Sequence, residues 1–233
     1  MTLLNNIKPY LYIITGSELY MTFKTIIFDL DGTVADTLSL CIMAFKKSVE
    51  PYLNREIEAE EILSNFGPSE EGTFKKLVPG YEAACTKAYL EHYEELHYLY
   101  PEPFSGIVEV LELLKEKNIQ LAMVTGKGNG SAVISLKKLG LASYFEILET
   151  GSPLGPDKVN GINRILKKLD ADLSSSLYIG DALSDIKYCK EVGIAIASVS
   201  WASTADKEKL EKANPDYLFE TVEEFHHWIE KSV

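Results

Sequence analysis

Cysteine is scarce in this sequence, which contains only Cys41, Cys85 and Cys189. Their odd number and wide spacing exclude a disulfide framework, and no CxxC pair or Cys/His cluster indicates zinc. We therefore expect three small buried side chains. A reducing compartment, the cytoplasm, fits this expectation.

Positive charge is also in short supply, with 23 Lys and Arg residues against 35 Asp and Glu residues and a net charge of −12. Nucleic-acid binding depends on clustered basic residues, so this balance argues against a nucleic-acid partner. No apolar run reaches the length of a membrane span, and we expect no membrane partner. The composition, 46% hydrophobic and 25% charged, is typical of a soluble globular protein.

The first 20 residues lack the features of a signal peptide. Their apolar stretch "YLYIIT" is short, and no A-x-A cleavage pattern accompanies it. Met21 opens "MTFKTIIFDLDGT", which reads as a natural start. We expect residues 1–20 to be an N-terminal extension, from a misassigned start or a dispensable segment, rather than a functional arm.

What the sequence does contain is a regular alternation of β-rich runs and helical patterns. The helical patterns show apolar residues at three- and four-residue spacing. This alternation predicts a Rossmann-like α/β fold, with a parallel sheet and helices on both faces. The predicted strands are residues 25–31, 119–125, 145–150, 177–181, 194–200 and 216–220.

The stretch from 38 to 100 contains no convincing strand. It reads as a series of helices closed by the breaker "YPEP". We therefore predict an α/β core formed by residues 21–37 and 101–233, with a separate small all-helical domain, 38–100, inserted after the first strand. We expect Asp36 to be the N-cap of the first inserted helix.

Polar residues stand where the predicted strands end, and the carboxyl ends of parallel strands meet at one edge of a sheet. Buried carboxylates are costly unless something pairs with them, and a hard cation such as Mg²⁺ prefers oxygen ligands. The sequence therefore predicts a Mg²⁺ site at this edge. The candidate site residues are Asp29, Asp31, Thr125, Gly126, Lys158, Asp181 and Asp185.

This arrangement indicates phosphoryl transfer. Asp29, Asp31 and Asp181 could share the cation, while Thr125 and Lys158 bind phosphate oxygens. One aspartate not fully engaged by the metal could attack phosphorus and form an aspartyl-phosphate. A second aspartate, two residues away, could protonate the leaving alcohol and then deprotonate water.

The segments "FDLDGTVADT", "VTGK", Lys158 and "YIGDALSD" resemble, in this order, the four motifs of the haloacid dehalogenase superfamily. The resemblance covers about residues 22 to 232, and the helical insertion resembles the C1-type cap of the phosphoglycolate-phosphatase-like branch. It implies that Asp29 is the nucleophile and that Asp31 is the general acid/base, with its backbone carbonyl on Mg²⁺. It further implies that Thr125 and Lys158 bind phosphate, Asp181 ligates the metal, and Asp185 supports the metal or Lys158.

Two features depart from that family's pattern. Val159 follows Lys158 where proline is frequent, which leaves Lys127 of "TGKG" as a rival for the phosphate-binding lysine. Trp201 is followed by Ala202 where Trp-Gly is frequent, and this has no implication for catalysis.

The leading hypothesis is a Mg²⁺-dependent phosphatase that acts on a small phosphorylated metabolite. The alternatives are a β-phosphoglucomutase-like phosphosugar mutase and, outside the enzymes, a receiver-type phospho-switch. Asp31 and the helical insertion argue against the receiver. The sequence leaves monomer and homodimer both open. The candidates for residues of the insertion that determine specificity are Arg55, Lys75, Lys76 and His97, and the sequence does not rank them. Acidic pairs such as Glu70–Glu71 are expected at the solvated surface.

Overall fold

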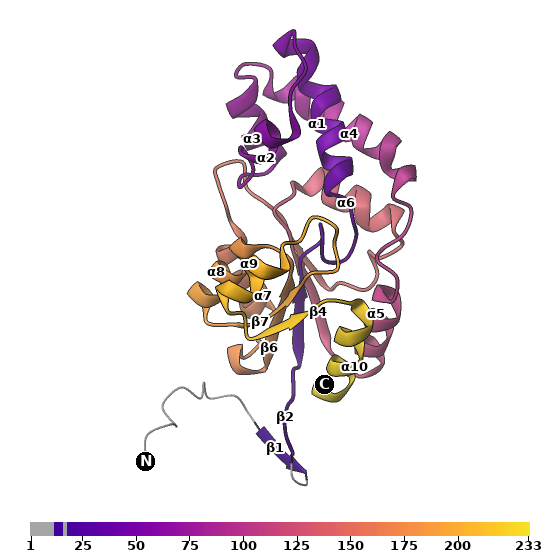
Figure 1. The fold of residues 1–233 in the computed structure, drawn as a ribbon, viewed down its shortest axis with the longest axis vertical. Helices are drawn as coiled ribbons and strands as arrows, with labels where there is room; N and C mark the ends of the chain where they lie inside the picture. The colour runs from indigo at the N-terminus through magenta and orange to yellow at the C-terminus, as the bar shows by residue number, and fades with distance from the viewer. Residues whose placement is uncertain (1–11, 16–17) are drawn as a thin grey trace.

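A computed structural model gives the fold and describes residues 12–15 and 18–233 (Figure 1). Two short strands, β1 (Tyr12–Thr15) and β2 (Glu18–Met21), pair in antiparallel fashion ahead of the main sheet. Residues 1–11 and 16–17 lie outside the described residues. The dispensability of residues 1–20 stays a prediction.

Six parallel strands form the main sheet, in the order β5-β4-β3-β6-β7-β8. The first strand of the set, β3, lies in the middle, with β4 on one side and β6 on the other. Strand order therefore reverses at β3, and the carboxyl end of β3 is where an open α/β sheet places its ligand. The strands are β3 (Thr25–Phe28), β4 (Gln120–Val124), β5 (Ile147–Glu149), β6 (Ser176–Gly180), β7 (Ala195–Val199) and β8 (Tyr217–Phe219).

Helices cover both faces of this sheet, as Figure 1 shows. Ile26 and Phe28 face a core that includes α5 (Ile107–Glu116) and α10 (Val222–Ser232). Ile27, one residue along the pleat, faces a second core, because successive strand residues point to opposite faces. That second core is formed with α7 (Lys158–Lys168), α8 (Leu183–Val192) and α9 (Lys207–Ala213). The Rossmann-like prediction is confirmed.

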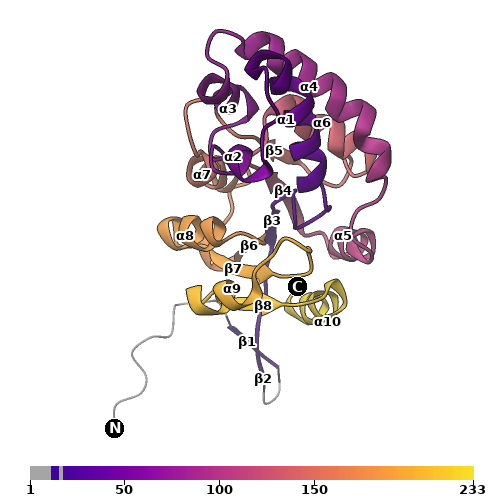
Figure 2. The ribbon, with the colours of Figure 1, turned by 45° about the horizontal axis from the view of Figure 1, so that its top comes forward.

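The inserted segment forms a separate group of helices with its own apolar core. Phe45 lies at the centre, with ring centroids 4.8 Å from those of both Phe74 and Tyr89. We call this group the helical bundle, and Figure 2 shows it above one end of the sheet. It comprises α1 (Leu38–Leu53), α2 (Ala59–Leu63), α3 (Glu70–Leu77), α4 (Glu82–Leu96) and the 3₁₀ turn η1 (His97–Leu99). The domain boundaries at 38 and 100 stay a prediction.

Two smaller expectations have different outcomes. All three cysteines are buried, as predicted, and none forms a disulfide. The prediction that Asp36 caps the first helix is wrong, because α1 has Thr37 as its N-cap and no side-chain capping bond. The Thr37 hydroxyl instead donates a hydrogen bond to the Asp31 carboxylate, within the loop that follows β3. Among the described residues, no helix combines the length and hydropathy of a membrane span.

Candidate active site

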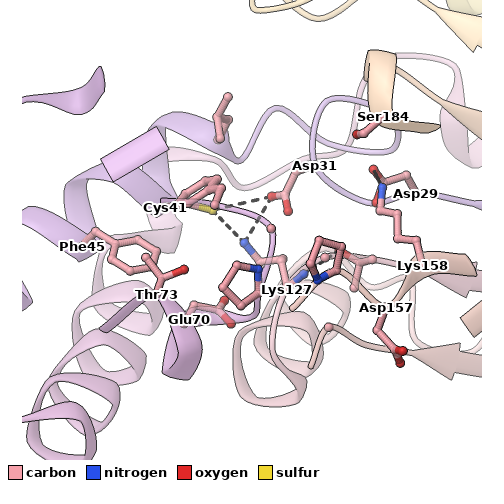
Figure 3. A pocket seen from close by; sticks show the side chains of 18 of the residues that line it. Asp29, Asp31, Cys41, Phe45, Glu70, Thr73, Lys127, Asp157, Lys158 and Ser184 are labelled. Carbon is pink, nitrogen blue, oxygen red and sulfur yellow. Dashed lines mark hydrogen bonds and ion pairs between the residues drawn. The ribbon is translucent and has the colours of Figure 1, made fainter. Parts of the chain in front are cut away.

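Asp29 is the first residue after β3, at the carboxyl end of the central strand. Its N–H continues the sheet by donating to the Ile179 carbonyl at 2.9 Å. Its Oδ1 accepts the Leu30 N–H at 2.7 Å, and its Oδ2 accepts from Lys158 Nζ at 2.6 Å. The backbone and the lysine thus fix a buried carboxylate, which Figure 3 shows beside Lys158.

Lys158 opens α7 and lies between two carboxylates. Its Nζ is 2.6 Å from Asp29 Oδ2 and 2.7 Å from Asp185 Oδ1. Asp185 is held in turn by the Tyr178 hydroxyl at 3.3 Å and the Ala182 N–H at 3.2 Å. Burial alone would lower the pKa of Lys158, but the charges of Asp185 and Asp29 outweigh burial and hold that pKa well above its ordinary value. Lys158 is therefore a permanent cation beside Asp29.

Asp29, Asp181 and Asp185 form a compact acidic cluster, with one oxygen of each lying within 4.8 Å of the others. Burial raises the pKa of Asp29 to about 7, even though Lys158 opposes this change. Burial, reinforced by the charge of Asp29, raises the pKa of Asp181 to about 8. These carboxylates are thus short of positive charge, and an all-oxygen donor set suits Mg²⁺. The Asp31 side chain is not part of the cluster, and its predicted ligand atom is its main-chain carbonyl.

The Asp31 carboxylate turns toward the helical bundle. Its Oδ1 accepts a hydrogen bond from the Thr37 hydroxyl and from Lys127 Nζ at 3.2 Å, and it lies 3.7 Å from Cys41 Sγ. Two aspartates separated by one residue therefore have different surroundings. Asp29 lies beside Lys158 of the core, whereas Asp31 lies beside Lys127 and Cys41 on the side of the bundle (Figure 3).

Lys127, the rival of Lys158 for phosphate binding, has a different carboxylate partner from Lys158. Its Nζ lies 3.2 Å from Asp31 Oδ1, 2.8 Å from Cys41 Sγ and 4.4 Å from the centre of the Tyr93 ring. Burial raises the pKa of the Cys41 thiol to about 12, so the thiol stays neutral. Lys127 is therefore the cationic partner of Asp31, as Lys158 is the cationic partner of Asp29.

Thr125 and Gly126 directly follow β4, at the carboxyl end of that strand. Thr125 is buried, and its hydroxyl accepts the N–H of Lys127 at 3.2 Å. An added Cβ on Gly126 would meet no atom within 4 Å, so the backbone here borders open space. Both residues line the same pocket as Asp29 and Lys158, and their role in phosphate binding stays a prediction.

The expectation that Glu70 is a solvated surface residue is wrong. Its carboxylate is buried and accepts the Gly128 N–H and the Ser131 hydroxyl at the start of α6 (Asn129–Lys138). Next to it, the Ser69 N–H donates to the Ser152 carbonyl at 2.9 Å. A helix N-terminus attracts a carboxylate, so these contacts attach the bundle to the core beside the site.

The bundle and the core together enclose a pocket of about 210 Å³. Its core wall is polar and its bundle wall is largely apolar, which suits a small molecule with one charged end. The core contributes Asp29, Asp31, Thr125, Gly126, Lys127 and Lys158, and the bundle contributes Leu38, Cys41, Phe45, Phe66, Glu70 and Tyr89, among others.

The family model for haloacid dehalogenase-like hydrolases matches residues 26–199. The chain belongs to this family. The match spans the strands that carry Asp29, Thr125 and Asp181, so the predicted resemblance is confirmed at the level of the family.

Curated haloacid dehalogenase-like relatives align over most of the chain. A protein named pyrophosphatase PpaX from Bacillus pumilus is 30% identical over 199 residues, covering 84% of this chain and 92% of that protein. Pyrophosphatase PpaX from Listeria welshimeri is 30% identical over 200 residues, covering 84% and 91%. Among solved structures, a hydrolase from Pseudomonas syringae aligns with a TM-score of 0.73 at 24% identity over 90% of this chain and all of that one, which shows the shared fold.

Gly32 allows a test of the position of Asp181 in this haloacid dehalogenase-like site, because a side chain at residue 32 would meet the Asp181 carboxylate. It has φ of +75°, and an added Cβ would lie 2.2 Å from Asp181 Oδ2. Gly32→Ala is expected to displace Asp181 and to lower kcat/KM by about a hundredfold, since small misplacements of reacting groups have effects of this size. Steady-state hydrolysis of p-nitrophenyl phosphate measures the change.

Gly140→Ala is the matched control for this substitution. Gly140 also has a positive φ, +71°, but an added Cβ there would meet nothing within 4 Å. Both variants carry the left-handed backbone penalty of about 1–2 kcal/mol, which urea denaturation measures. Only Gly32→Ala is expected to lose activity, and an equal activity loss in both variants would show that the contact with Asp181 is irrelevant.

The raised pKa values of the acidic cluster predict that Mg²⁺ stabilises the protein more at about pH 8.5 than at about pH 6. In the folded state the pKa of Asp29 is about 7 and that of Asp181 about 8, against 3.8 ordinarily. Between about pH 4 and pH 8 the folded state binds more protons than the unfolded state, so the metal-free protein loses stability as pH rises. Bound Mg²⁺ requires both carboxylates ionised and offsets this loss. Thermal melts with and without Mg²⁺ measure the shift, and a smaller shift at the higher pH contradicts the prediction.

Proposed function

We propose that this protein is a Mg²⁺-dependent phosphatase that hydrolyses a small phosphorylated metabolite through an aspartyl-phosphate on Asp29. One observation carries the proposal. The Asp29 carboxylate lines a small pocket, with Lys158 at 2.6 Å and the carboxylates of Asp181 and Asp185 beside it.

In this proposal, residues of the core bind and attack the phosphoryl group. An Asp29 oxygen attacks phosphorus, and Lys158 balances the charge that develops on the phosphoryl oxygens. Thr125 and the backbone at Gly126 orient the same oxygens. Asp29, Asp181, Asp185 and the Asp31 carbonyl would hold Mg²⁺, which supplies positive charge to the phosphate and offsets the repulsion within the acidic cluster.

Asp31 transfers protons in both halves of the reaction. It protonates the leaving oxygen as the P–O bond breaks, and it then deprotonates the water that attacks the aspartyl-phosphate. Its hydrogen bonds to Thr37 and Lys127 keep its carboxylate on the bundle side of the pocket, where the leaving group would lie. The helical bundle would act as a cap that excludes bulk water while the phosphoryl group is transferred.

The names of the relatives suggest the first substrate to test. Relatives 30% identical to this chain are named pyrophosphatases, so pyrophosphate heads a screen of small phosphorylated metabolites. Released phosphate measures turnover. For the phosphosugar mutase, formation of glucose 6-phosphate from β-glucose 1-phosphate without free phosphate is the diagnostic result.

Asp31→Asn is expected to accumulate the aspartyl-phosphate, because the variant lacks the base that activates the hydrolytic water. The measurement is acid quenching after addition of ³²P-labelled p-nitrophenyl phosphate, whose weakly basic leaving group departs without a proton from Asp31. Label on the variant protein is expected to approach one phosphoryl group per chain, whereas the wild-type protein, which turns over, retains little.

The double variant with Asp29→Asn and Asp31→Asn is the control, and it should retain no label because the acceptor oxygen is missing. A labelled double variant would place the phosphoryl group elsewhere. The decay of the label also tests the receiver alternative, because a wild-type phosphoprotein that lasts minutes to hours suits a switch, and rapid decay suits a phosphatase.

A further inference from the structure

Lys127 is a buried cation that the phosphatase chemistry above leaves without a role toward the substrate. It lines the pocket, but its side chain is only 4% exposed. Its Nζ contacts the Asp31 carboxylate and the neighbouring Cys41 thiol, and it lies over the Tyr93 ring. A buried ammonium with a single anionic partner carries a large desolvation cost, so its retention beside Asp31 calls for an explanation.

The position of Asp31 fixes what lies next to Lys127 during the reaction. A general acid must come within hydrogen-bond reach of the leaving oxygen. Lys127 Nζ is 3.2 Å from the Asp31 carboxylate. Whatever is attached to the leaving oxygen therefore lies beside the Lys127 ammonium.

The remaining charges of the pocket are already engaged. Lys158 pairs with Asp29 and Asp185, on the phosphoryl side. The Glu70 carboxylate accepts hydrogen bonds at the start of α6. Among the described residues that line the pocket, Lys127 is thus the cation available to the leaving group.

Asp31 would keep one hydrogen-bond partner if Lys127 turned toward the substrate. The Thr37 hydroxyl bonds to the same Asp31 oxygen and holds the carboxylate in place. The wall around them is apolar, with Leu38, Phe45 and Tyr89 from the bundle. An ion pair in such surroundings is screened little by water, so a negative charge on the substrate would interact strongly with Lys127.

We propose that Lys127 is a specificity-determining residue that selects substrates whose leaving group carries its own negative charge. The fitting classes are phosphoanhydrides and phosphate esters of hydroxy acids. This inference rests on the proposed phosphatase function. As Asp29 attacks phosphorus, the bond from phosphorus to the leaving oxygen breaks with its electron pair on oxygen. That oxygen takes the proton of Asp31, while Lys127 pairs with the anionic group next to it.

The first experiment compares pyrophosphate with p-nitrophenyl phosphate, whose leaving groups have comparable basicity but differ in charge. The readout is the ratio of the two kcat/KM values, because a general loss of catalysis cancels in it. In Lys127→Met the ratio of pyrophosphate to p-nitrophenyl phosphate is expected to fall by about tenfold to a hundredfold, the effect of a lost charged hydrogen bond. Lys127→Arg keeps the charge and should retain most of the ratio.

Lys138→Met is the matched control. Lys138 belongs to the same helix as the residues after Lys127 and also reaches the bundle, with its Nζ 3.4 Å from Glu94, but it does not line the pocket. Its substitution should leave the ratio at the wild-type value. An unchanged ratio in a folded Lys127→Met protein would overturn the inference while leaving the phosphatase function in place.

A second experiment uses the wild-type protein alone, so it does not depend on the folding of a variant. Phosphoglycolate and its amide share the leaving oxygen and differ in one charge. The acid is expected to have a kcat/KM at least about tenfold higher. Equal values would overturn the inference, and no hydrolysis of any phosphate compound in the presence of Mg²⁺ would overturn the phosphatase function along with it.

Discussion

Asp29→Asn is expected to reduce phosphate release from p-nitrophenyl phosphate by at least about 10⁴-fold, since loss of a nucleophile removes the covalent route. The amide has nearly the shape of the carboxylate but cannot form a phosphorylated intermediate. Steady-state phosphate release at saturating Mg²⁺ measures the effect. Robust turnover by this variant would refute the assignment of Asp29 as the nucleophile.

The fold should survive this substitution, which separates catalysis from stability. Lys158 keeps its 2.7 Å contact with Asp185 when the charge of Asp29 is lost. The amide also relieves the repulsion that contributes to the raised pKa values of the acidic cluster. Thermal melts should therefore show no loss of stability in metal-free buffer.

Asp157→Asn is a suitable control for the nucleophile. Asp157 lines the same pocket and precedes Lys158, but its carboxylate pairs with Arg164 at 2.8 Å. We expect less than about a tenfold change in activity, because that pair is partly exposed and outside the proposed reaction. Similar losses in the two variants would indicate a general effect of charge in the pocket.

Removal of divalent cations with EDTA is expected to abolish the same activity, and excess Mg²⁺ should restore it. The protein has a net charge of −12, and three carboxylates lie within 4.8 Å of one another where a phosphate dianion must bind. Lys158 alone does not balance them. Without the cation the substrate is repelled, so both kcat and the apparent affinity should fall.

Replacement of Mg²⁺ by Ca²⁺ distinguishes a catalytic requirement from simple charge neutralisation. Ca²⁺ prefers more ligands at longer distances than Mg²⁺, so it should bind the same oxygens but position them poorly. We expect protection against thermal unfolding with little turnover. Full activity in the presence of the chelator would contradict the proposed metal dependence.

The residues at the strand ends could be predicted from the sequence, because the pattern of apolar runs indicates where each strand ends. Asp29, Thr125 and Asp181 follow apolar runs that form adjacent strands, and parallel pairing brings the ends of those runs together. The resemblance to the family's motifs favours Lys158 over Lys127, and the structure pairs Lys158 with Asp29. The family match confirms the fold that this pattern indicated.

Contacts between the bundle and the core could not be predicted in the same way. Helical periodicity identifies which bundle residues share a face, but not how the bundle lies on the sheet. Glu70 follows Ser69 in a polar stretch that resembles an exposed helix start, and only tertiary packing brings it to Gly128. The partners of Lys127 include Cys41 and Tyr93, which belong to different helices of the insertion.

The attachment of Glu70 to α6 has an electrostatic consequence for substrate capture. If the bundle swings away to admit a ligand, it withdraws one carboxylate from the mouth of the cavity and uncovers the partially positive amide end of a core helix. An incoming anion would then meet a less repulsive entrance than the closed form presents. When the bundle closes again, the Glu70 carboxylate would return behind the bound anion. The entrance would therefore repel an anion least while it is open.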